Sequence, residues 1–290
     1  MGTIGVDEVQ RGDILLVTQR PGDPLAELII DLDRSPNHFS HGGVAGGNGT
    51  IISSYPSTLE GLMPVEVGGL HHDPFEHFWG YGQSIHRLVL PDGVDRKAAL
   101  ARLDRYPESR ETTFGIAKIV MVAAALHALI HEEQLGEEAT GAVVLSAIVA
   151  GEAWSSETDF FCAEFAAHIY DLTELPFTVA DLRPGGPVRG LEEAARRTLI
   201  KFGMQGLLLG RTDEEQETLR AFVATVEEHD PAFFDEGVQV LLDAALHGLG
   251  LGRRGAALPD ETAVPAALIT PRMLAAWGTA TEEIRRPGKG

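Results

Sequence analysis

Two consecutive segments near the middle of the chain constrain its fold most. Residues 112–134 and 138–150 each have the length of a helix and are apolar on nearly every side. A helix of this kind has no face for water, so each must be buried or must cover another apolar surface. The longest apolar stretch, residues 116–130, carries Lys118 and His127 and is shorter than the about 20 apolar residues that a helix needs to cross a bilayer. We therefore expect a buried helical pair and no integral membrane segment.

The first ninety residues have a different pattern, in which short apolar segments alternate with turn residues. The pattern predicts a β-rich region, with a hairpin whose tight turn uses the glycines of residues 46–49. Residues 71–77, which are rich in histidine, are predicted to form a loop or a short helix. The expected strands cover residues 13–18, 42–45, 50–55 and 83–90.

Helical periodicity dominates the rest of the chain. Residues 160–170 are predicted to form a helix that begins at about Asp159 or Phe160, because Thr158 and Asp159 are good N-caps. Further helices are expected over residues 24–33 and 96–106. The C-terminal third is also predicted to be helical, with a linker at 183–187, a capping-box helix start at 212–215 and a flexible loop at 250–259.

Charge and cysteine content exclude several classes of function. The chain has 23 Lys and Arg against 43 Asp and Glu, a formal net charge of −20, which argues against a nucleic-acid partner because phosphate binding depends on basic residues. A single cysteine, Cys162, excludes an intramolecular disulfide and a thiolate-rich zinc site. The first residues lack the pattern of a signal peptide, so we expect a cytoplasmic protein.

Cys162 is the most interesting candidate for chemistry. In the first turn of a helix, backbone N–H groups and the helix dipole stabilise a thiolate and can hold an oxyanion. Cys162 also shares a helical face with Phe165, Ala166 and Ile169, so packing in the core is an equally physical interpretation. A cysteine nucleophile needs a base, and His41, at the start of a predicted strand, is the best placed, although a structural histidine is the alternative.

The histidines of residues 71–77 suggest a metal site. His72, Glu76 and His77 come close to a metallopeptidase motif, but Asp73 stands where that motif requires histidine, and Pro74 disfavours a continuous helix. A solvated surface loop is the simpler interpretation. We therefore expect no metal and no cofactor, and keep a metallohydrolase built on His71, His72 and His77 as a third hypothesis.

The motifs and their order resemble a known family. R-G-D-I-L at residues 11–15 and S-P-N-H-F-S-H-G-G-V at residues 35–44 resemble the first block of the circularly permuted, NlpC-type papain-like cysteine hydrolases and acyltransferases. D-F-F-C-A-E-F at residues 159–165 resembles the second block, and the histidine precedes the cysteine, as in permuted members. Residues 268–274, or less closely residues 178–182, resemble the segment that often follows the nucleophile helix in this family.

The resemblance implies an α+β fold with a permuted papain-like core, in which a small antiparallel sheet packs on the nucleophile helix. By this resemblance Cys162 is the nucleophile and His41 is its general base. A family member commonly has Glu or another polar residue on the next strand to orient the imidazole; here Ser53, or less closely Ser54, stands there. Serine can accept the proton of the ring but lacks the charge that stabilises an imidazolium.

The resemblance also divides the chain. Residues 1–184 are expected to form the core, with a helical insertion at about 105–150. Residues 185–290 are expected to form a helical extension, of which residues 263–278 pack back on the core. Since the insertion directly precedes Cys162, its apolar helices either enlarge the core or line a pocket for an acyl chain.

Taken together, these features predict a cysteine hydrolase (a thiol protease or amidase) or an acyltransferase. It would act on an amide or ester of a peptide or a lipid-like small molecule, through a thioester on Cys162. The alternative is a catalytically weak papain-like protein that binds an acyl chain or peptide without turning it over.

Overall fold

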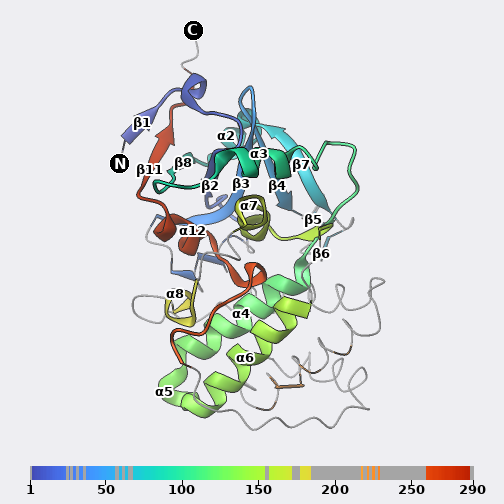
Figure 1. Ribbon diagram of the computed structural model, residues 1–290, viewed down its shortest axis with the longest axis vertical. Helices are drawn as coiled ribbons and strands as arrows, with labels where there is room; N and C mark the ends of the chain where they lie inside the picture. The colour runs from blue at the N-terminus through green and yellow to red at the C-terminus, as the bar shows by residue number, and fades with distance from the viewer. Residues whose placement is uncertain are drawn as a thin grey trace.

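A computed structural model of the chain shows a mixed α/β fold built around a seven-stranded sheet. The sheet lies at one end of the molecule and a pair of apolar helices at the other, with α7 (Cys162–Tyr170) between them (Figure 1). The residues that the structure describes are 2–23, 37–55, 59–60, 63–64, 68–153, 157–171, 177–183 and 259–287, with single residues between 26 and 34 and between 217 and 228.

The main sheet is antiparallel except at one edge, where β1 and β11 run parallel. Its strands, in spatial order, are β1 (Gly2–Ile4), β11 (Ala280–Ile284), β8 (Ile85–Val89), β2 (Ile14–Thr18), β3 (Phe39–Gly47), β4 (Thr50–Tyr55) and β7 (Gly69–Pro74). Two small pairs accompany it: β9 (Thr113–Phe114) with β10 (Asp159–Phe160), and β5 (Leu59–Glu60) with β6 (Met63–Pro64).

Helices cover both faces of the main sheet. On one face α2 (Phe75–Gly80) contributes Phe75, Phe78 and Trp79 to a small apolar core. On the other face α7 belongs to a larger core that continues into the apolar helix pair. The remaining helical elements are η1 (Val6–Glu8), α3 (Arg96–Leu103), α4 (Ile116–Ile130), α5 (Glu132–Leu135), α6 (Glu137–Ala153), α8 (Val179–Leu182), η3 (Ala266–Leu268) and α12 (Pro271–Trp277).

The apolar helix pair predicted from the sequence is confirmed as α4 and α6. Val143, Val144 and Ala147 are fully buried in the larger core. α4 begins later than predicted, at Ile116, because residues 113–114 pair with β10. Among the helices of the described residues, none combines the length and apolarity needed to cross a membrane.

The four predicted strands are confirmed as β2, β3, β4 and β8, but the other three strands of the main sheet, β1, β7 and β11, and the four short strands of the small pairs were not predicted. Residues 71–77, expected as loop or short helix, extend as β7 to Pro74 and turn into α2 at Phe75. Proline is tolerated there because it ends an edge strand. Residues 280–284 were expected to belong to a helical extension. They form β11, which lies between β1 and β8 in the sheet.

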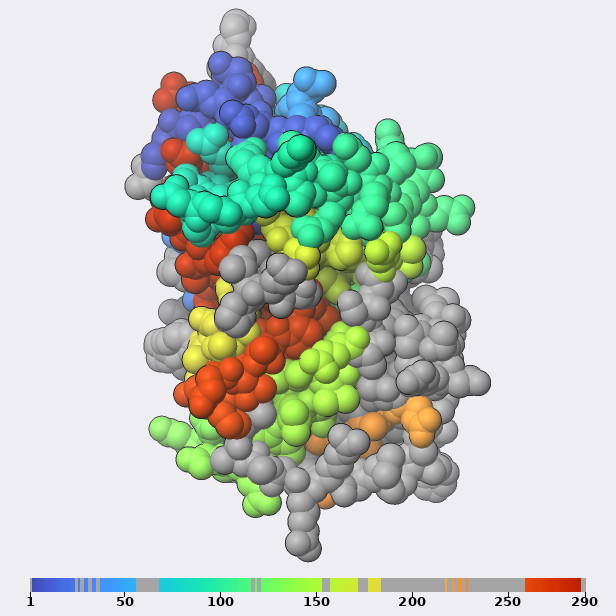
Figure 2. Space-filling view, in the orientation of Figure 1, coloured from blue at the N-terminus to red at the C-terminus, as the bar shows by residue number. Residues whose placement is uncertain are grey.

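Other predicted elements are described in part. In the helix expected over 24–33, the described residues Ala26, Ile29, Ile30 and Asp33 are helical. Residues 184–187, 212–215 and 250–258 lie outside the described residues, as does most of the extension expected after residue 184. Figure 2 shows the red C-terminal segment running from the N-terminal part of the molecule down to the green helices.

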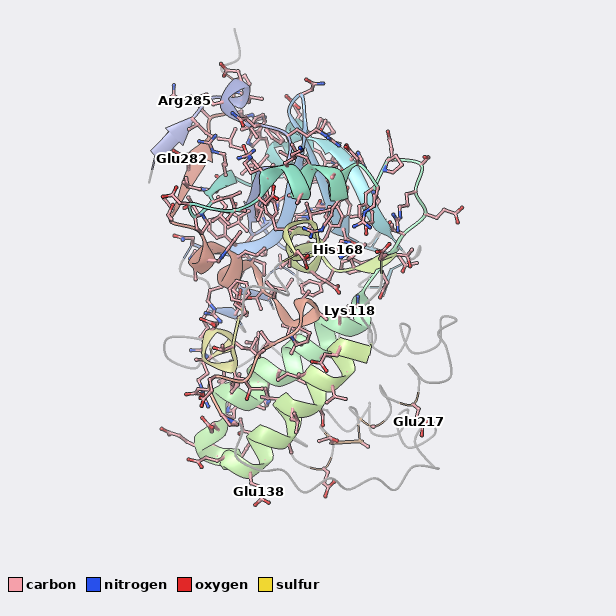
Figure 3. The ribbon with its side chains drawn as sticks, viewed as in Figure 1. Lys118, Glu138, His168, Glu217, Glu282 and Arg285 are labelled. Atoms are coloured by element: carbon pink, nitrogen blue, oxygen red, sulfur yellow. The ribbon has the colours of Figure 1, made fainter. Side chains whose placement is uncertain are left out.

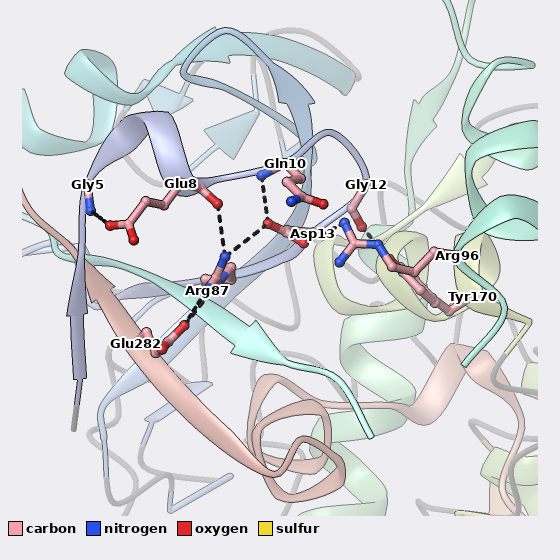
Figure 4. Close-up of polar contacts among 9 residues, drawn as sticks. All are labelled: Gly5, Glu8, Gln10, Gly12, Asp13, Arg87, Arg96, Tyr170 and Glu282. Carbon is pink, nitrogen blue, oxygen red and sulfur yellow. Dashed lines mark hydrogen bonds and ion pairs between the residues drawn. The ribbon is translucent and has the colours of Figure 1, made fainter. Parts of the chain in front are cut away.

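A buried carboxylate joins the sheet to its surroundings. Asp13, the residue before β2, forms ion pairs with Arg96 at 2.7 Å and with Arg87 at 3.9 Å, and Arg87 also pairs with Glu282 of β11 (Figure 4). The hydroxyl of Tyr170 donates to the carbonyl oxygen of Gly12 at 2.5 Å. This hydrogen bond attaches the C-terminal end of α7 to the turn that precedes β2.

Candidate active site

Cys162 is the first residue of α7, which begins two residues later than predicted because residues 159–160 form β10. Phe161, rather than Thr158 or Asp159, is the N-cap. The start of the helix packs against β3, where a Cβ added to Gly42 would lie 3.5 Å from the Cα of Ala163. The strand and the helix therefore lie close together beside the cysteine, at a distance that would place a Cβ of residue 42 in ordinary contact with the helix.

The sulfur of Cys162 is buried among backbone N–H groups. The residue is 4% exposed, and this burial raises the pKa of its thiol to about 11. The backbone N–H groups of Gly42, Ala163 and Cys162 itself act in the opposite direction and lower the pKa, while the Asp33 carboxylate adds to the rise. In this arrangement the thiol is neutral at pH 7, although its surroundings contain the donors that a thiolate or an oxyanion needs.

His41 lies on the other face of the sheet. It pairs across the strands with Val17, which belongs to the small core under α2. Its ring stacks on Phe78 of α2, and lies edge-on to Tyr55, with 6.0 Å between ring centroids in both pairs. The structure therefore does not bring the side chains of His41 and Cys162 together.

Burial lowers the pKa of His41 to about 4, with Asp73 raising it and His71 and His77 lowering it. The imidazole is consequently neutral at pH 7. Its Nε2 is buried and has no hydrogen-bond partner among the described residues. A neutral imidazole can accept a proton, so the protonation state suits a base even though the position does not.

Ser53 shares the face of His41. It pairs with His71 across β4 and β7, and its hydroxyl is buried and, like Nε2 of His41, unpartnered within the described part of the chain. Ser54 faces the opposite way and donates to the carbonyl oxygen of Phe160 at 2.7 Å. The structure thus brings Ser53 and His41 to one face but shows no hydrogen bond between them.

The three histidines of the metal hypothesis do not converge. His71 and His72 are adjacent residues of a strand, so their side chains point to opposite faces. His71 stacks on Tyr55 at 4.0 Å, and the Tyr55 hydroxyl donates to Asp73. Burial and this hydrogen bond raise the pKa of Tyr55. In the part of the chain that the structure describes, no group of three or more His, Cys, Asp or Glu residues is arranged to hold a metal ion.

Two charged residues beside Cys162 were missed by the sequence analysis as site residues. Lys118 of α4 is fully buried and donates to Glu164 of α7 at 2.7 Å. Glu164 in turn accepts the N–H of Phe161, the residue before Cys162, at 3.2 Å. The available signals were the single lysine of a largely apolar helix and a glutamate two residues after the cysteine.

One cavity in the described part of the structure lies between α4, α6 and α8, and Cys162 does not line it. It has a volume of about 240 Å³. Its lining combines apolar residues of α4 and α6 with charged ones, and does not include Cys162, so it gives the expected acyl-chain pocket no support. The lining residues are Leu129, Glu132, Glu137, Thr140, Gly141, Val144, Val179, Arg183 and Asp260.

The geometry defines a buried cysteine at the start of a helix, packed against a strand whose histidine faces away. No protein-family model, no curated protein and no solved structure matches the chain.

Proposed function

We propose that the protein is a cysteine-dependent hydrolase or acyltransferase with a permuted papain-like core, acting on an amide or ester with Cys162 as the nucleophile. The observation that carries the proposal is the position of Cys162 as the buried first residue of α7, packed against β3, where the backbone N–H groups of Gly42, Ala163 and Cys162 itself favour the thiolate. Such donors stabilise a thiolate before attack and the carbonyl oxygen after it. The substrate class, a peptide, an amide or a lipid-like ester, stays open within this proposal.

In the proposed reaction the Cys162 thiol gives its proton to a base as the sulfur attacks the carbonyl carbon. The carbon–sulfur bond forms, the oxygen becomes an oxyanion, and the leaving amine or alcohol departs with the proton returned by the base. Water or another acceptor then attacks the thioester and restores the thiol. Hydrolysis and acyl transfer differ only in this last acceptor.

The proposal requires the side chain of His41 to reach the face of the sheet that packs on α7. A shift of one residue in the bulge of β3 would turn it towards that face. Ser40 is the extra residue of a bulge where β3 passes between Val17 and Thr18 of β2. If His41 became the extra residue, Ser40 would pair with Val17 and the pairs on either side would be unchanged. Bulges next to active sites commonly re-aim a side chain in this way. Since Nε2 of His41 has no partner within the described residues, leaving the α2 face breaks no hydrogen bond of that atom.

The experiment uses p-nitrophenyl acetate and intact-protein mass spectrometry. We expect an acetyl adduct on Cys162 and a burst of p-nitrophenolate, both lost in Cys162→Ser. His41→Asn should slow the burst by about 100-fold or more, the usual contribution of a general base. His38→Asn is the matched control, because His38 is an exposed histidine three residues earlier, and it should leave the burst unchanged. An adduct that forms no faster than on N-acetylcysteine at the same pH rejects the proposal.

A second candidate is a papain-like protein that binds an acyl chain or peptide without turnover. It is favoured by the raised pKa of the thiol and by the position of His41 on the far face. In that case wild type and Cys162→Ala should retain the same co-purified ligand in the same amount. A ligand covalently attached to Cys162 in the wild type alone would instead support the enzyme.

A further inference from the structure

Lys118 is a cation in a fully buried position. It lies at the end of α4 nearest to α7 (Figure 3) and is 0% exposed. Its Nζ donates to the carbonyl oxygen of Asp159 at 2.5 Å and to Oε1 of Glu164 at 2.7 Å, and lies 3.6 Å from the Asp159 carboxylate. Burying an ammonium group is costly unless it is paired. An apolar side chain at position 118 would pack the helix without that cost, so the contacts of Lys118 point to a role other than packing.

The contacts of Lys118 converge on the residues around Cys162. Glu164 uses its second oxygen, Oε2, to accept the N–H of Phe161 at 3.2 Å. Phe161 is the N-cap of α7, and Cys162 follows it directly. One carboxylate therefore connects the inserted helix α4 to the backbone whose N–H groups surround the sulfur.

We propose that Lys118 is a positioning residue for Cys162. By holding the Glu164 carboxylate against the N–H of Phe161, it fixes the first turn of α7 and so aims the N–H groups of residues 162 and 163 at the sulfur. The inference rests on the proposed function, since it assigns these groups to thiolate and oxyanion stabilisation. The same contacts give the inserted helices a role, because α4 holds the first turn of the nucleophile helix in place.

The charges around the Glu164–Phe161 hydrogen bond explain why it depends on Lys118. Burial raises the pKa of Glu164, and Lys118 opposes that rise. Without Lys118, the Glu164 and Asp159 carboxylates would face each other in the core with no cation between them, and Asp33 faces Cys162 from a third segment. Glu164 would then leave its place, or take up a proton and accept the N–H of Phe161 more weakly than the carboxylate does, and in either case the link to Phe161 would weaken.

The test measures the rate at which iodoacetamide alkylates Cys162 between pH 7 and pH 10. As Cys162 is the only cysteine, the mass of the intact protein reports this thiol alone. Lys118→Met is expected to slow alkylation at pH 8 by about 10-fold and to move the rate–pH curve to higher pH, since one pH unit corresponds to a factor of 10. Lys97→Met, the same change at an exposed lysine of α3, should match the wild type.

Two double variants keep the test decisive if Lys118→Met does not fold. Lys118→Met/Glu164→Gln and Lys118→Met/Glu164→Ala both remove the ion pair, but only glutamine can still accept the N–H of Phe161. We expect the glutamine variant to react within about 3-fold of the wild type and the alanine variant about 10-fold more slowly, a difference of roughly one pH unit in the curve.

The inference is overturned if a folded Lys118→Met has the rate–pH curve of the wild type, or if the two double variants react alike. A purely structural role of Lys118 would lower the melting temperature and leave the curve in place. Failure of the proposed function is a separate result, because it is read from the acetyl adduct of the wild type and not from alkylation.

Discussion

The position of His41 has a measurable consequence for stability. Its pKa is about 4 in the folded protein and 6.5 as a free side chain. Between these values the unfolded chain binds a proton that the folded chain does not, so stability contributed by the neutral ring is complete above about pH 6.5 and lost as the pH falls towards 4. The change is at most about 3 kcal/mol.

Urea unfolding at pH 7, 6 and 5 should show a flatter pH dependence for His41→Asn than for the wild type, and His38→Asn should behave as the wild type. Equal slopes for His41→Asn and the wild type would show that the buried ring does not exclude its proton.

At the scale of single residues, the sequence predicted the place of Cys162 in its helix better than the face to which His41 points. Cys162 was predicted in the first turn of a helix because a cap and an apolar stripe are local patterns. The face of His41 depends on one extra residue, Ser40, in the pairing with β2, and a one-residue change of register reverses the face of a side chain. The partners of Lys118 lie 41 and 46 residues away along the chain, so no local pattern could reveal them.

Two neighbouring glycines of β3 should lose different amounts of stability on the same substitution to alanine. A Cβ added to Gly43 would lie 2.7 Å from the carbonyl oxygen of Ile52 and 2.8 Å from Cβ of Ser53, so the strands would have to move apart. At Gly42 the nearest atom is 3.5 Å away, an ordinary contact. Gly43→Ala should therefore reduce the free energy of unfolding by about 1–3 kcal/mol, and Gly42→Ala by less than about 1 kcal/mol. Urea denaturation of both variants measures the difference, and a Gly43→Ala as stable as Gly42→Ala would contradict it.

At the scale of elements, prediction succeeded where the pattern is periodic and failed where pairing is distant. The apolar helices and four strands follow from local spacing. β7 was missed because two histidines, an aspartate and a proline are typical of a loop; its strand conformation comes from pairing with β4 over residues 69–74. β11 was missed for the same reason, since its neighbours β1 and β8 lie near the opposite end of the chain.

For the whole molecule, the position of β11 means that the sheet needs both ends of the chain. β11 lies between β1 and β8, and Arg87 of β8 pairs with Glu282 across them. A division into a core of residues 1–184 and a separate extension therefore does not describe the sheet, because residues 280–284 form the strand that connects β1 to β8. Fragments that end before residue 280 would leave β1 without its partner and expose the edge of β8.

Ile284 tests this dependence without shortening the chain. It is 2% exposed and packs in the small core under α2, together with Ile4 and Ile85. Ile284→Ala should lower the free energy of unfolding by about 2–4 kcal/mol, as expected for removing a large aliphatic side chain from a core. Glu283→Ala, at an exposed neighbouring position, is the control and should change it by less than about 0.5 kcal/mol. Because β11 is the one neighbour of β1 among the described strands, hydrogen exchange in residues 2–4 should rise together with that in residues 280–284. Loss of protection in β11 alone, with β1 unchanged, would show that the N-terminal strand is held independently of the C-terminal one.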